Sequence, residues 1–73
     1  MSEESENYAQ ELAETIVEFE KYRERLLAET LEAAQKAKLM KAQVMAKLAP
    51  ELADIDSKIA QLRQQQADLN TGN

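Results

Sequence analysis

The chain has 73 residues and a net charge of −5, from 9 Lys or Arg and 14 Asp or Glu. Apolar residues make up 44 % of it, and the 12 alanines among them leave 20 bulky apolar side chains for a core. There is one Gly, one Pro, and no Cys, His or Trp. The lack of Cys and His excludes a disulfide framework, a zinc finger, a thiol nucleophile and a histidine base.

The scarcity of Gly and Pro argues against many turns and therefore against a multi-stranded sheet. No apolar run approaches the roughly 20 residues that a membrane span needs. The acidic N-terminus is the reverse of the basic start of a signal peptide. We therefore expect an all-α protein located in the cytoplasm.

The first segment, residues 1–7, is polar and acidic, and we expect it to be frayed. Residues 8–49 are rich in Ala, Leu, Glu and Lys, which predicts a long amphipathic helix. Pro50 suits the first position of a second helix over 50–69, since its missing N–H is not needed there. Residues 70–73 are expected to be a disordered tail. The alternative is a single long helix kinked at Pro50, at a cost of about 3 kcal/mol.

Apolar residues from the proline region onward follow a heptad pattern, with steps that alternate between three and four. This spacing gives a helix one narrow apolar row and is typical of a coiled coil. We call this row the coiled-coil seam, and its predicted members are Met45, Leu48, Leu52, Ile55, Ile59, Leu62 and Leu69. Gln66 occupies the remaining core position, where it either fixes the register or belongs to a frayed helix end.

The first predicted helix carries a wider apolar stripe, which suits packing against two neighbours. At 1.5 Å per residue this helix would measure about 60 Å, and the second helix only about 30 Å. The N-terminal half of the first helix would then be left uncovered and would need a partner. We predict that its apolar residues form a partner or self interface, namely Leu12, Ile16, Phe19, Tyr22, Leu26 and Leu27.

Charge is distributed in blocks of −7 over residues 1–32, +4 over 33–49 and −2 over 50–73. A parallel dimer would place the acidic blocks on each other, whereas an antiparallel one sets acidic against basic segments. A chain this short also rarely stabilises itself from one core. We predict a helical hairpin broken at Pro50 that forms an antiparallel homodimer or a four-helix-type bundle. A monomeric helix pair that orders on a different partner is the alternative.

Folding the second helix back at Pro50 also predicts which charges would meet. The acidic residues of the second helix are expected to lie beside lysines of the basic block. The residues concerned are Glu51, Asp54 and Asp56 on one side, and Lys41 and Lys47 on the other.

Carboxylates are the only plentiful reactive groups, and Glu11, Glu14 and Glu18 share one helix face. Carboxylate metal sites in helical bundles also use His, which is absent, so we predict no metal, no cofactor and no catalytic residue. None of the Ser and Thr hydroxyls stands beside a base. The net charge and the lack of aromatic residues among the basic-block lysines argue against nucleic acid. The acidic N-terminal half argues against a membrane surface.

These observations favour a non-enzymatic interaction protein, such as an adaptor, a regulator or a chaperone-like protein. We expect it to self-associate and to bind an unidentified partner protein through a helix face. One alternative is an acidic regulator that blocks a basic nucleic-acid-binding site on its target through residues 3–32. Another is an assembly or scaffolding subunit of a larger particle.

Overall fold

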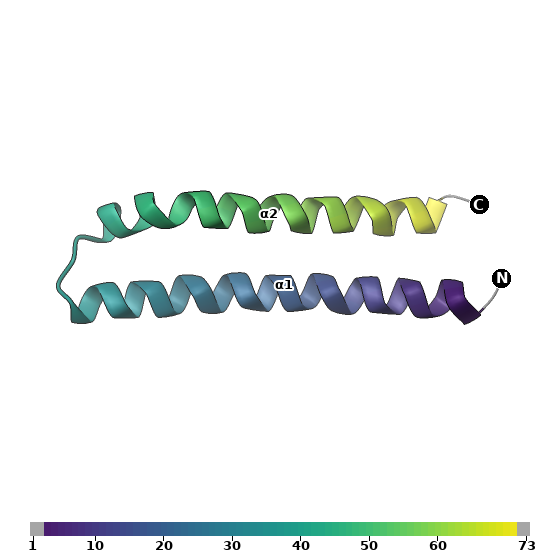
Figure 1. Cartoon of the computed structure of the whole chain (residues 1–73), viewed down its shortest axis with the longest axis horizontal. Helices are drawn as coiled ribbons and strands as arrows, with labels where there is room; N and C mark the ends of the chain where they lie inside the picture. The colour runs from purple at the N-terminus through teal and green to yellow at the C-terminus, as the bar shows by residue number, and fades with distance from the viewer. Residues whose placement is uncertain (1–2, 72–73) are drawn as a thin grey trace.

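The computed structural model describes residues 3–71, with side chains over 7–70, and consists of two helices. Helix α1 covers Glu3–Lys36 and helix α2 covers Lys41–Thr71. They run antiparallel and side by side in a rod of 55 × 16 × 11 Å, with Glu3 and Thr71 at the same end (Figure 1). The prediction of an all-α helical hairpin is confirmed. Residues 3–7 and 70–71, which were expected to be frayed or disordered, belong to the two helices. The remaining residues of those two segments, 1–2 and 72–73, lie outside the described part.

The turn of the hairpin lies at residues 37–40, so the predicted break at Pro50 is wrong. Lys38 adopts the left-handed conformation, with φ of 59°. The Lys38 amide donates to the Gln35 carbonyl at 3.1 Å, and the Leu39 amide donates to the Ala34 carbonyl at 2.9 Å. This pair of bonds is the Schellman motif, which satisfies carbonyls at a helix end and reverses the chain. A lysine occupies the position that usually holds glycine.

Pro50 lies well inside α2 and its side chain is exposed. Proline within a helix removes the hydrogen bond to the carbonyl four residues earlier, which here belongs to Ala46. Ala46 is exposed as well, so water can reach that carbonyl. The proline therefore weakens α2 without ending it.

The two helices have similar lengths, 34 and 31 residues, and each covers the other along most of the rod. The expectation that the N-terminal half of the first helix is uncovered is therefore wrong, since Leu12 and Ile16 are each only 5 % exposed. The other buried apolar residues are Ala34, Leu48, Leu52 and Ile55. No side chain over 7–70 is buried completely. The hairpin has a thin core.

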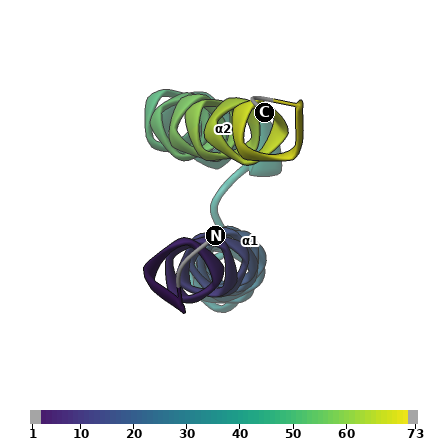
Figure 2. The ribbon, with the colours of Figure 1, turned by 90° about the vertical axis from the view of Figure 1, so that its right-hand side faces the viewer.

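Part of the coiled-coil seam lies on the side of α2 that faces α1. Leu48, Leu52 and Ile55 are buried there, whereas Leu69 near the open end is exposed. The half-buried members of the row are Met45, Ile59, Leu62 and Gln66. Viewed end-on, the molecule is one pair of helices, so each helix has a single neighbour within the chain (Figure 2). Both lateral sides of the helix pair therefore face solvent.

Candidate interaction surface

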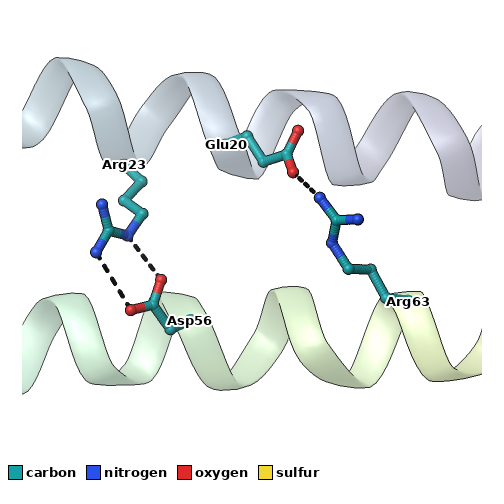
Figure 3. Close-up of polar contacts among 4 residues, drawn as sticks. All are labelled: Glu20, Arg23, Asp56 and Arg63. Atoms are coloured by element: carbon teal, nitrogen blue, oxygen red, sulfur yellow. Dashed lines mark hydrogen bonds and ion pairs between the residues drawn. The ribbon is translucent and has the colours of Figure 1, made fainter.

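An ion pair joins the two helices near the middle of the rod (Figure 3). Arg23 of α1 donates from Nε to Asp56 Oδ1 at 2.6 Å and from Nη2 to Asp56 Oδ2 at 3.3 Å. Arg23 interrupts the apolar stripe of α1 and is half-buried, with its side chain 36 % exposed. Two parallel hydrogen bonds fix the direction of the guanidinium plane. The contact therefore favours one register of the helices.

A second ion pair has the opposite polarity: Arg63 of α2 donates to the Glu20 carboxylate of α1 (Figure 3). Asp56 thus pairs with α1, and the expectation that it lies beside Lys41 or Lys47 is wrong. The reason is the position of the turn, because a hairpin that reverses at 37–40 sets Asp56 opposite the middle of α1. Each helix contributes one cation and one anion to these pairs.

The contact with Asp56 also affects the titration of Arg23. The hydrogen bond to Asp56, and then the attraction of its charge, raise the pKa of Arg23 above its ordinary value. A raised pKa means that the stabilisation is complete at lower pH and is lost only as the pH rises through the pKa of the folded state. Because an arginine is charged at neutral pH in any case, the raised pKa leaves this ion pair unchanged across the neutral range.

Residues that flank the contact between α1 and α2 fall on two lateral sides of the helix pair. A rotation of 100° per residue along each helix decides on which side a residue lies. The aromatic side is defined by the α1 residues Tyr8, Thr15, Phe19, Tyr22, Leu26, Ala33 and Ala37 and by the α2 residues Val44, Leu62, Gln65 and Leu69. The alanine side is defined by Ala13, Val17, Glu20, Leu27 and Leu31 of α1 and by Ala49, Ala53, Asp56, Ala60, Arg63 and Ala67 of α2. The ion pair between Glu20 and Arg63 lies on the alanine side. The hydroxyl of Tyr8 donates to Gln65 Oε1 at 3.2 Å on the aromatic side.

The aromatic side contains an open groove of about 500 Å³ next to the turn. Small α1 side chains, Ala33, Ala34 and Ala37, leave the space. Larger residues and the polar margin complete the lining, namely Leu26, Thr30, Leu39, Gln43, Val44, Lys47, Leu48 and Glu51. A mostly apolar hollow with a few polar groups at its edge can accept a bulky apolar side chain.

The residues predicted to form an interface have different surroundings in the structure. Leu12 and Ile16 are buried between α1 and α2. Phe19 and Leu26 are half-buried on the aromatic side, beside Tyr22, which is 45 % exposed. Leu27 is half-buried on the alanine side. The structure thus brings three of the six predicted residues together on one surface.

Leu26 and Leu48 were among the predicted site residues, but the alanines of the groove that they line were not. Ala33 and Ala37 are one helical turn apart, and Ala34 lies between them. Such a cluster of alanines opposite larger residues is a signal for a hollow, but only when the helix that faces it is known. Because the turn was predicted at Pro50, Val44 and Leu48 were expected on the same helix as the alanines and not on the helix that faces them.

The two ends of the rod differ in charge. Residues 30–49, which contain the turn, have a net charge of +3, whereas the rest of the chain has −8. The cations near the turn are Lys36, Lys38, Lys41 and Lys47, and all four are exposed. The molecule is therefore an electrical dipole along its length, with a basic turn end.

The structure offers no evident site for an ion within its described range. Over residues 7–70, whose side chains the structure describes, no group of three or more acidic side chains is arranged to hold a metal. Neither helix, over the same range, has an apolar stretch long enough to cross a membrane.

Comparison with known proteins identifies the family and no function. The model of a family described as Domain of unknown function (DUF8630) matches residues 10–71, and the chain belongs to this family. The match spans nearly all of both helices and the turn. A search of curated proteins and a search of solved structures found no match.

Proposed function

We propose that this member of an uncharacterised family is a non-enzymatic protein-interaction module that binds an α-helix along its aromatic side. The observation that carries the proposal is the continuity of apolar surface there. Exposed Tyr22 and half-buried Phe19 and Leu26 lead directly into the groove beside the turn. Aromatic residues next to a hollow are the features that contribute most of the binding energy in protein interfaces.

Much of the apolar surface on the aromatic side stays exposed to solvent in the hairpin. Tyr8 and Tyr22 are 47 % and 45 % exposed, and Leu39, which lines the groove at the turn, is 56 % exposed. Burying apolar surface contributes about 25 cal/mol per Å², so covering several such side chains supports an interface. A helix laid along the rod would contact them together, because they extend from the open end to the turn.

The aromatic side is better suited to bind a helix than an extended strand. A strand binds by adding to the edge of a sheet, and the chain has no sheet over residues 3–71. A helix binds through side chains spaced three or four residues apart, which enter a groove between two helices. The groove beside the turn has this form, because residues of both α1 and α2 line it.

Site-specific photo-crosslinking tests the proposal in the cells that make the protein. A photoreactive benzoylphenylalanine replaces Tyr22 in one variant and Val17 in the matched control. The two positions are equally exposed, at 45 %, and lie on opposite lateral sides of α1. We expect protein adducts from position 22 well above those from position 17. Equal yields from the two positions, or no adducts at all, would contradict the proposal.

A further inference from the structure

We propose that the helix received by the aromatic side is α1 of a second copy of this chain, packed antiparallel so that the two hairpins form a four-helix bundle. This inference rests on the proposed function and names the partner of the same surface. Three independent features support it: the positions of the aromatic residues, the distribution of charge, and the area of one lateral side.

Phe19 and Tyr22 lie close to the middle of α1, which covers Glu3–Lys36. Antiparallel packing of α1 on its copy, about a two-fold axis at this level, sets Phe19 of each chain opposite Tyr22 of the other. Two-fold interfaces use the same patch on both copies, so the four rings form one cluster at the axis. Aromatic pairs in such clusters add to the stabilisation from buried area alone.

The same arrangement sets the open end of one chain against the turn of the other. Tyr8 then faces Ala33 of the second copy, which lines the groove. The position of Tyr8 is fixed before binding, because its hydroxyl donates to Gln65 at 3.2 Å while the residue remains 47 % exposed. The groove of about 500 Å³ can receive its ring. The contact occurs twice, once on each side of the two-fold axis.

Charge selects this orientation over the parallel one. An antiparallel pair places the +3 turn segment of each chain on the acidic open end of the other. A parallel pair would place the two turn segments together and the two acidic ends together. Repulsion between like charges disfavours such a pair, most strongly at low salt.

The available area matches what a dimer needs. One lateral side of the rod is 55 Å long and 16 Å wide. Full overlap of two such sides gives an interface close to the standard size, which is about 800 Å² per partner. The overlap is full only when the two-fold axis lies near the middle of the rod, which is the level of Phe19 and Tyr22.

Disulfide trapping of the purified full chain tests the arrangement, since the natural sequence has no Cys. The test variant combines Tyr8→Cys with Ala33→Cys. The two sites are about 37 Å apart along one helix, so they cannot bond within a chain. We expect a covalent dimer under mild oxidation, with mass spectrometry showing position 8 of one chain joined to position 33 of the other.

Three controls make the outcome decisive. Gln10→Cys with Gln35→Cys keeps the spacing and exposure but lies away from the aromatic side, so it should form no covalent dimer. The single variants Tyr8→Cys and Ala33→Cys should form no covalent dimer either. Linkage in a single variant would indicate parallel chains, and equal linkage of the two double variants would indicate random collision. Either result overturns the proposal, as does the absence of a link between positions 8 and 33 in a chain shown helical by circular dichroism.

The photo-crosslinking experiment separates this inference from the proposed function. Adducts of position 22 with a different protein would still support the proposed function.

Discussion

Arg23 of α1 and Asp56 of α2 form a two-point ion pair across the hairpin, with Nε–Oδ1 and Nη2–Oδ2 distances of 2.6 and 3.3 Å. Arg23 interrupts the apolar stripe of α1, where an aliphatic side chain would bury more apolar surface. Its contribution is specificity, because the fork of the guanidinium fits the carboxylate in one register of the two helices.

Reversing one charge of this pair should lower the thermal midpoint by a few degrees. In Arg23→Glu the two carboxylates repel each other across the helix interface, and the same holds for the cations in Asp56→Arg. The double variant, Arg23→Glu with Asp56→Arg, should regain part of the loss because the attraction returns with its direction inverted. Thermal unfolding of all four proteins gives the coupling between the two sites. Additive losses in the double variant would show that the pair is not coupled.

Truncation in the core should cost far more than the same truncation at the open end. Leu52→Ala removes a residue that is 8 % exposed, and we expect a loss of unfolding free energy of about 2–5 kcal/mol. Leu69→Ala is the matched control in the same helix, at 38 % exposed, and should cost less than about 1 kcal/mol. Urea unfolding followed by circular dichroism measures both. Equal losses would contradict the assignment of the core.

Glycine at the turn should stabilise the protein. Lys38 has φ of 59°, a conformation that costs residues with a Cβ about 1–2 kcal/mol and costs glycine almost nothing. After the greater flexibility of glycine in the unfolded chain is subtracted, Lys38→Gly should raise the unfolding free energy by about 1 kcal/mol. Lys47→Gly, inside α2, should instead lower it by about 1 kcal/mol. A destabilised Lys38→Gly variant would place the turn elsewhere.

Replacing the internal proline should also stabilise the protein. Pro50→Ala restores an amide donor for the Ala46 carbonyl and should raise the unfolding free energy by up to about 3 kcal/mol. Ala53→Pro, at another exposed position of α2, is the reverse change and should lower it by a similar amount. A loss of stability in Pro50→Ala would mean that the proline has a structural role that an uninterrupted helix cannot supply.

The helical class and the apolar rows could be predicted from the sequence, because composition and spacing act locally. The position of the turn could not. Pro50 is the strongest helix-breaking signal in the chain, whereas Lys38 carries none of the usual marks of a helix end. A lysine adopts the left-handed conformation here because the hydrogen bonds to Gln35 and Ala34, together with the packing of α2 on α1, outweigh its local cost.

The candidate surface was predicted only in part, for a related reason. Phe19, Tyr22 and Leu26 could be recognised from their size and spacing within one helix. The groove depends on which residues of α2 face Ala33 and Ala37, and that pairing follows from the turn. The misplaced turn therefore also gave the wrong partner for Asp56 and an uncovered half of α1 that the structure does not have.

Sedimentation velocity over a series of micromolar concentrations tests the central claim most directly, with Tyr22→Ala and Val17→Ala compared with the natural chain. The account predicts that the natural chain and Val17→Ala shift from monomer to dimer as the concentration rises. Tyr22→Ala should stay monomeric over the same series, with its helical content unchanged by circular dichroism. A natural chain that is monomeric throughout, or two variants that behave alike, would contradict the aromatic side as the surface of self-association.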